Sequence, residues 1–410
     1  MFALGCGDDG GGAAADGGGT ESDSASASAS EGGTEESASG SSGTTADSAE
    51  SGEASSGESG AEESSGGVVV TGIPVLGDGT HDMGNVNVEI ISSPEDGLNF
   101  PSDLEFKPGV PGELWVTNRE DHSIVIYEDA GGANQVADKR QATFDNGPHF
   151  LAKPASLAFG DNGAFATAQQ ERAATQPGDP EDGSFMGPTL WTADIDVFNG
   201  GHTSHLDMLH NSPLSSGIAH ESENTYWVFD GEHGSLTRYK FNNDHGLGGT
   251  DHTDGEIYRY ADAELAHVPS IPSHVVLDGQ YVYAADSGNG RIVRLDPSTA
   301  AEGNSIIPNY DGCRMNYMDG ATLDTLVDGS ALDPELTTPS GLEMHDGILF
   351  TTDPLTGRIY GFDMDGNLLD WLDTGLDQGA VMGLAFDEDG NMWVTDAAEN
   401  QIRKFSPVEG

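Results

Sequence analysis

A short unit recurs six times along the chain, and this repetition constrains the fold more than any other feature. Each unit opens with an apolar-alternating segment. The six openings are PSDLEF from Pro101, PASLAF from Pro154, SSGIAH from Ser215, PSHVVL from Pro272, PSGLEM from Pro339 and VMGLAF from Val381. A second apolar segment ends 14 to 17 residues after each start, and in five units a third begins shortly afterwards. Short alternating segments separated by Gly and Asp turns predict strands, so we expect an all-β array.

Two of the units allow a closer comparison. PSHVVLDGQYVYAADSGNGRIVRLD and VMGLAFDEDGNMWVTDAAENQIRKFS resemble NHL repeats. Six such repeats over residues 101–407 imply a six-bladed β-propeller, with blades starting near residues 101, 154, 215, 272, 339 and 381. Starts separated by 42 to 67 residues fit blades that carry loop insertions. The resemblance predicts the fold and leaves the function open, because one fold hosts many activities.

The ends of the propeller should meet. The last unit ends after its third strand, near Pro407, which leaves an open sheet edge. The alternating segment VNVEII, residues 86–91, precedes the first unit and has no other partner. We therefore expect it to pair as the outer strand of the last blade, because closing the ring removes the exposed edge.

The N-terminal part is organised differently. Residues 7–67 are almost entirely Gly, Ala, Ser, Thr, Asp and Glu, so they predict a disordered acidic linker. Before it, residues 1–6 resemble the end of a bacterial lipobox, which implies lipid attachment at Cys6. This layout predicts a monomeric extracytoplasmic protein, anchored at the bacterial cell envelope or surface, whose propeller domain spans residues 68–410. Cys313 is then expected to be a buried free thiol.

Charge restricts the partners. The chain has 70 acidic and 15 basic residues, a formal net charge of -55. Such a surface repels nucleic acid and anionic lipid, and it concentrates cations. No later stretch is apolar enough for a membrane span, so Cys6 is the only membrane attachment we expect. The partner is predicted to be an extracytoplasmic protein or a small ligand.

Histidines suggest where a ligand could bind. Nine of the thirteen lie between His202 and His274. In a propeller, the blade-to-blade connections and the turns between second and third strands share one face, which we term the top face. The other turns lie on the bottom face. His202, His205 and His210 precede the third unit, so they should lie on the top face. We predict a top-face ligand site at the channel mouth that comprises Asp230, His274, His210 and His233. Asp230 has an alternative, structural role, because five units end their second strand with Asp or Asn. Such residues should accept hydrogen bonds from their own turns and, with Arg291 and Arg358, form salt bridges.

A second group belongs to the loop NNDHGLGGTDHTDGE, residues 242–256, between the third and fourth strands of the third unit. This position predicts the bottom face, so the two histidine groups should be separate. Imidazoles and carboxylates on a glycine-rich loop suit a divalent ion, Ca²⁺ or Zn²⁺, bound by His245, Asp251, His252 and Asp254. The alternative is an exposed polar loop without a metal.

Three functions remain open. The first is a binding scaffold without chemistry. The second is a metal-dependent lyase similar to peptidyl-α-hydroxyglycine α-amidating lyase, a resemblance that implies zinc held by histidines from several blades. At the corresponding positions the blade openings here carry Ser, Ala or Met rather than His, and His274 lies one residue later. The third is a lactonase-type hydrolase, whose characteristic blade openings are absent. Whether the protein is an enzyme is left undecided by the sequence.

Overall fold

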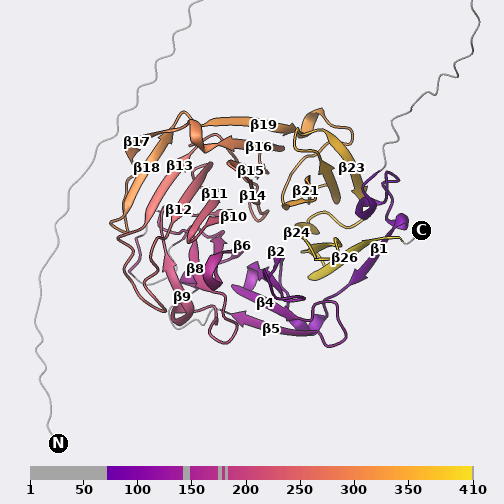
Figure 1. Ribbon diagram of the computed structural model, residues 1–410, viewed down its shortest axis with the longest axis horizontal. Helices are drawn as coiled ribbons and strands as arrows, with labels where there is room; N and C mark the ends of the chain where they lie inside the picture. The colour runs from indigo at the N-terminus through magenta and orange to yellow at the C-terminus, as the bar shows by residue number, and fades with distance from the viewer. Residues whose placement is uncertain (1–71, 142–147, 174–177, 181–182, 409–410) are drawn as a thin grey trace, which may run out of the picture. The chain divides into compact units, whose positions relative to one another are not determined.

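The computed structural model describes residues 72–141, 148–173, 178–180 and 183–408. They form a six-bladed β-propeller, with the blades arranged around a central channel (Figure 1). The linker and Cys6 lie outside the described residues. Among the residues described, no helix combines the length and the apolar character that crossing a bilayer requires.

Each blade is a four-stranded antiparallel arrangement that runs from the channel outwards. The first strands are β2 (Pro101–Phe106), β6 (Pro154–Phe159), β10 (Ser215–Ser222), β14 (Val275–Asp278), β20 (Leu342–His345) and β24 (Val381–Phe386). The second strands are β3 (Leu114–Asn118), β7 (Ala164–Gln169), β11 (Thr225–Asp230), β15 (Tyr281–Asp286), β21 (Ile348–Asp353) and β25 (Met392–Asp396). These strands coincide with the repeated segments in the sequence.

The outer strands complete the blades. The third strands are β4 (Ser123–Glu128), β8 (Thr189–Thr192), β12 (Ser235–Lys240), β16 (Arg291–Asp296), β22 (Arg358–Phe362) and β26 (Gln401–Pro407). The fourth strands are β5 (Val136–Gln141), β9 (His205–Met208), β13 (Glu256–Tyr260), β19 (Thr322–Asp328), β23 (Leu368–Asp373) and β1 (Val86–Ile90). Apolar side chains fill the space between adjacent blades; Trp115 of blade 1 and Trp191 of blade 2, for example, share one buried cluster.

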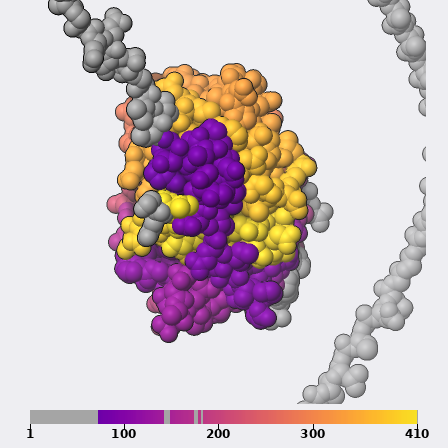
Figure 2. Space-filling view, turned by 90° about the vertical axis from the view of Figure 1, so that its right-hand side faces the viewer, coloured from indigo at the N-terminus to yellow at the C-terminus, as the bar shows by residue number. Residues whose placement is uncertain are grey.

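The ring closes through the N-terminal segment. Strand β1 pairs antiparallel with β26, from Val86 opposite Pro407 to Ile90 opposite Arg403, so residues 86–90 form the outer strand of the last blade. The preceding turn buries Ile73 and Leu76 against blades 5 and 6. Figure 2 shows this indigo segment lying on the yellow C-terminal surface. The closure therefore covers the edge of β26, which would otherwise be unpaired.

Blade 3 carries an addition that the repeats do not predict. The chain between β16 and β19 of blade 4 forms a hairpin, β17 (Ala301–Ser305) and β18 (Arg314–Asp319). Strand β18 pairs in parallel with β13, which extends the blade 3 sheet to six strands. Cys313 precedes β18 and is a buried free thiol, as expected, and burial raises its pKa to about 12.

Candidate functional site

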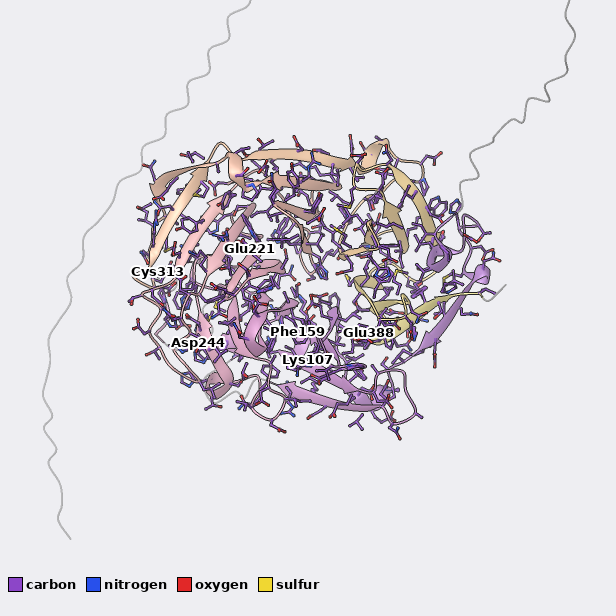
Figure 3. The ribbon with its side chains drawn as sticks, viewed as in Figure 1. Lys107, Phe159, Glu221, Asp244, Cys313 and Glu388 are labelled. Atoms are coloured by element: carbon purple, nitrogen blue, oxygen red, sulfur yellow. The ribbon has the colours of Figure 1, made fainter. Side chains whose placement is uncertain are left out.

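The central channel contains a cavity of about 500 Å³, which is within the range of small-molecule sites. Its wall is built from the first strands of the blades. The polar lining residues include Asp103, Glu105, Ser156, His220, His274 and Glu343, and the apolar ones include Phe159, Ile218, Leu277, Met344 and Leu384. Figure 3 labels Phe159 beside the central opening. Among the described residues that line the cavity there is no lysine or arginine.

The cavity opens towards the bottom face. Side chains at the start of the first strands, such as Ser102, Ser273 and Ser340, are fully buried. Backbone contacts close this end, since His274 N–H donates to Ser340 O (3.0 Å). Exposure increases along the same strands towards the turns between first and second strands, where Asp346 is exposed. A ligand therefore reaches the cavity from the bottom face, not from the top face that the sequence suggested.

Three carboxyl groups dominate the wall. Asp103 lies deepest, and it accepts hydrogen bonds from Ser156 Oγ (2.8 Å) and from the backbone N–H of Leu157 (2.9 Å). Glu105 accepts one from Phe159 N–H (3.0 Å). Glu343 comes from blade 5 and faces the same cavity. Sequence reasoning missed all three residues.

These carboxyl groups are difficult to ionise together. Burial raises the pKa of Glu343 to about 8, with a smaller contribution from the nearby charge of Asp103. Burial also raises the pKa of Glu105 well above its ordinary value, and Asp103 and Glu343 add to that increase. Burial raises the pKa of Asp103 too, although His274 and the hydrogen bonds oppose this. The cavity is thus an acidic site without a cationic partner among its lining residues.

Glu343 should make stability depend on pH. Its pKa is about 8 in the folded protein and near the ordinary value of 4.5 after unfolding, so the folded state holds the proton more tightly between these values. Stability is then highest at low pH within this window and falls by up to about 1.4 kcal/mol per pH unit as the pH rises. Glu343→Gln should reduce this slope in urea titrations at several pH values. Parallel slopes for the two proteins would contradict the raised pKa.

His274 is the one predicted site residue in this cavity. Its Nδ1 lies 3.5 Å from Asp103 Oδ1, and its buried Nε2 has no hydrogen-bond partner among the described residues. Burial lowers the pKa of His274, and the charge of Asp103 opposes that effect. The side chain is therefore a largely neutral imidazole that offers one ring nitrogen to the cavity.

The four predicted top-face residues do not form one site. His233 Nδ1 is within hydrogen-bond distance of Asp230 Oδ2, at 2.8 Å, in a turn of blade 3. His210 is buried and instead contacts Asp311 at 2.6 Å. His274 lines the channel cavity. The prediction grouped these residues by their position along the chain, whereas their side chains point into different parts of the fold.

Asp230 has a structural environment. Its carboxylate is fully buried and accepts hydrogen bonds from Ser212 Oγ (2.7 Å) and His233 N–H (3.0 Å). Arg259 lies 3.4 Å away. Burial would raise the pKa of Asp230, but the bond from His233 and the charge of Arg259 together lower it below its ordinary value. These contacts agree with the alternative role given to the second-strand carboxylates, in which they anchor the following turn.

The second-strand positions of other blades show the same use. In blade 4, Asp286 accepts from Arg291 Nε at 2.7 Å. In blade 5, Asp353 accepts from Thr337 N–H at 2.7 Å. Arg358 was expected to pair with Asp353, but its Nε instead lies 3.9 Å from Asp373 Oδ2.

The predicted metal residues separate into two pairs. His245 and His252 lie close to Asp207 of β9. Asp251 instead caps its own turn by accepting from Thr253 N–H (3.1 Å), and Asp254 accepts from Asn243 N–H (3.2 Å). The four residues therefore do not form the predicted ligand set.

The two histidine groups are also not separate, which corrects the second expectation. The ring centroids of His205 and His245 are 4.9 Å apart. The error arose because residues 189–214 were taken as one connection on the top face. They contain β8 and β9, so His205 begins an outer strand at the bottom face, where the 242–256 loop also lies.

Comparisons with known proteins support the fold only. No protein-family model and no curated protein matches the sequence. A crystal structure of an auxiliary nutrient binding protein from Bacteroides ovatus is 14% identical, with a TM-score of 0.50, over 79% of this chain and 77% of that chain. An auxiliary nutrient binding protein from Bacteroides thetaiotaomicron is 12% identical, with a TM-score of 0.51, over 76% of this chain and 69% of that chain. Virginiamycin B lyase from Staphylococcus aureus is 11% identical over 79% of this chain and 100% of that chain. Its TM-score of 0.45 is too low to support a functional comparison.

Proposed function

We propose that this protein is a binding propeller whose channel cavity takes a small organic molecule with a positively charged group, an ammonium or a guanidinium. The observation that carries this proposal is the set of Asp103, Glu105 and Glu343 around one cavity whose described lining has no lysine or arginine. Burial raises the pKa of each carboxyl group. In the empty cavity the ionised carboxylates are destabilised by burial. A bound cation stabilises them, and this stabilisation contributes to its affinity.

The spacing of the carboxyl groups favours an organic cation over a metal ion. Three groups that share one ion need ligand atoms within a few ångströms of each other. Among the described residues, the one cluster that meets a 4.8 Å limit lies elsewhere, at Asp207, His245 and His252. The cavity also has an apolar wall, which suits the carbon frame of an amine ligand.

Binding is favoured over metal-dependent lyase chemistry by the same lining. The lyase resemblance implied zinc on histidines from several blades. The cavity as described includes two histidines, His220 and His274, and His220 Nε2 lies 2.9 Å from Glu223 O. A three-histidine zinc site therefore cannot be assembled from these lining residues.

The wider setting of the proposal is an exported protein. We propose that the chain is an NHL-type propeller held at the bacterial cell envelope by a lipid on Cys6. Two proteins with a similar fold are named auxiliary nutrient binding proteins, which supports a role in binding small molecules. The acidic surface would raise the local concentration of a cationic ligand.

Calorimetric titration with putrescine and spermidine tests the proposal, with 1,4-butanediol as a neutral analogue of putrescine. We expect the amines to bind at pH 8 and the diol not to bind. Glu343→Gln should lower the affinity for the amines at least about 10-fold, because it removes one charge from the cavity wall. Glu388→Gln is the matched control, since Glu388 is exposed on another blade (Figure 3).

Affinity should also rise with pH up to about 8, because the cation binds the ionised form of Glu343 and releases its proton. Equal binding of the diol and the amines would contradict a charge-selective cavity. So would amine binding that is unchanged in both Glu343→Gln and Glu105→Gln.

A further inference from the structure

The outer edge between blades 2 and 3 brings together residues that the channel site does not use. The loop from β12 to β13 crosses over to β9 of the neighbouring blade. Its backbone is fixed there, since His245 N–H donates to Leu206 O (3.2 Å) and Gly248 N–H to His205 O (3.0 Å). Gly248 has a φ of 68°, a conformation that favours glycine. Figure 3 labels Asp244 of this loop, farther from the channel than Phe159.

Three ligand-type side chains meet at this contact. Single atoms of Asp207, His245 and His252 all lie within 4.8 Å of one another. Asp207 Oδ1 is 2.7 Å from His252 Nδ1 and 4.0 Å from His245 Nε2. Asp207 belongs to blade 2 and the two histidines to blade 3, so the cluster spans the interface between blades.

The cluster contains buried polar atoms without partners. His245 Nε2 and Asp207 Oδ2 are fully buried and have no hydrogen-bond partner among the described residues. The side chains of His245 and Asp207 are 3% and 0% exposed. Buried polar atoms are nearly always paired, so two orphans in one cluster indicate an absent ligand. His245 Nδ1 lies 2.7 Å from Gly246 O, which fixes the ring with Nε2 towards Asp207.

His210 supplies a fourth candidate ligand. Its ring centroid is 6.0 Å from that of His252, and its Nε2 is also buried without a partner among the described residues. Its Nδ1 lies 2.6 Å from Asp311 Oδ1, and Asp311 Oδ2 accepts from the His210 N–H (2.9 Å). A carboxylate that holds the second ring nitrogen in this way is the usual support of a metal-bound histidine.

We propose that Asp207, His245, His252 and His210 bind a zinc ion that links blade 2 to blade 3. Three imidazoles and one carboxylate favour zinc over calcium, which prefers oxygen ligands. Tetrahedral zinc needs ligand atoms roughly 3.3 Å apart, so on binding His245 moves closer to Asp207 and His252 moves slightly away from it. The glycine-rich loop that carries His245 and His252 permits this movement. With four protein ligands the site is closed, and its role is structural.

The zinc site is independent of the amine site proposed for the channel. Its residues belong to outer strands and their loops, and none of them lines the channel cavity. Failure of either proposal therefore leaves the other untouched.

The test is zinc binding by the full chain, prepared without a histidine tag and stripped with EDTA. We expect one equivalent of zinc by elemental analysis after dialysis, and a higher melting temperature with zinc than with EDTA. Asp207→Asn and His245→Gln should each weaken zinc binding at least about 100-fold. His345→Gln is the matched control, because His345 lies on β20 of blade 5 and should keep full affinity.

Folding of the variants is checked without metal. In EDTA the variants should melt within a few degrees of the wild type, so that a loss of affinity reports on ligands and not on unfolding. Zinc uptake that is equal in the wild type, Asp207→Asn and His245→Gln would overturn the proposal. So would the absence of uptake by folded wild-type protein at micromolar zinc.

Asp311→Asn tests the part assigned to His210. Loss of a supporting carboxylate typically costs 10–100-fold in metal affinity. We therefore expect about that loss with the stoichiometry kept at one. The cobalt-substituted wild type should show the intense visible absorption of a four-coordinate site, and His210→Gln should change it. Unchanged affinity and spectrum in both variants would remove His210 from the ligand set.

Discussion

A chain that begins at residue 93 should not form a stable propeller, whereas one that begins at residue 72 should. The shorter chain lacks β1 and the turn before it, which bury Ile73, Val75, Leu76 and Val86 against blades 5 and 6. Each buried aliphatic side chain contributes about 1.5–3 kcal/mol, so the four together approach the whole stability of a typical domain, about 5–15 kcal/mol. Thermal unfolding of the two chains measures the difference.

The same truncation exposes the edge of β26. An unpaired edge strand is a template for pairing with other molecules, so any folded fraction of the 93–410 chain should form dimers or larger assemblies. Size-exclusion chromatography with light scattering detects them. The 72–410 chain keeps all the contacts described for β1 and serves as the control. Equal melting temperatures and monomeric elution for both chains would show that the closing strand is dispensable.

The sequence predicted the propeller because its signal is repeated and local. Alternation of apolar and polar residues has the period of a strand, and six copies of one pattern leave few other architectures. The strand at residues 86–91 followed from the same reasoning, since an open edge requires a partner. By contrast, the hairpin of β17 and β18 has no counterpart in other units. Its pairing with β13 depends on a neighbouring blade, which local pattern cannot reveal.

The histidine assignments failed where the local signal is weak. Strand β9 has four residues, His205–Met208, and the repeats give no pattern for fourth strands. Without it, His205 and Asp207 were placed on the wrong side of the blade or ignored. The contact between Asp207 and His252 joins residues 45 positions apart on different blades. Only the packing of the two blades brings them together.

The channel carboxylates did leave a signal in the sequence. The fifth residue of the blade opening is Glu105 in the first unit and Glu343 in the fifth. In the other four units this position is Ala or Val. A glutamate at an otherwise small apolar position of an innermost strand is costly to bury and points to function. Aligning the repeats position by position would have predicted both glutamates of the acidic cavity.

Asp230→Ala should destabilise the protein by about 3–5 kcal/mol, because it removes one partner of a buried ion pair. Asp230 and Arg259 are both almost fully buried. After the substitution, Arg259 keeps contacts with Asn211, but its charge has lost its carboxylate. Ser212 Oγ and His233 also lose their acceptor. Urea unfolding measures the loss, and Glu388→Ala, an exposed substitution, should stay within about 0.5 kcal/mol of the wild type.

The affinity of Asp230→Ala for putrescine separates a structural role from a ligand-binding one. Asp230 lies outside the channel lining, so the folded variant should bind the amine as the wild type does. Asp230→Asn keeps the size of the side chain and part of its hydrogen bonding. Its stability should therefore lie between that of the wild type and that of Asp230→Ala. If Asp230→Ala kept its stability and lost the ligand, the top-face site would be correct and the acidic cavity would not be the binding site. The burial of Asp230 between Ser212, His233 and Arg259 argues for the opposite result, because both of its carboxylate oxygens already accept hydrogen bonds and have little left to offer a ligand.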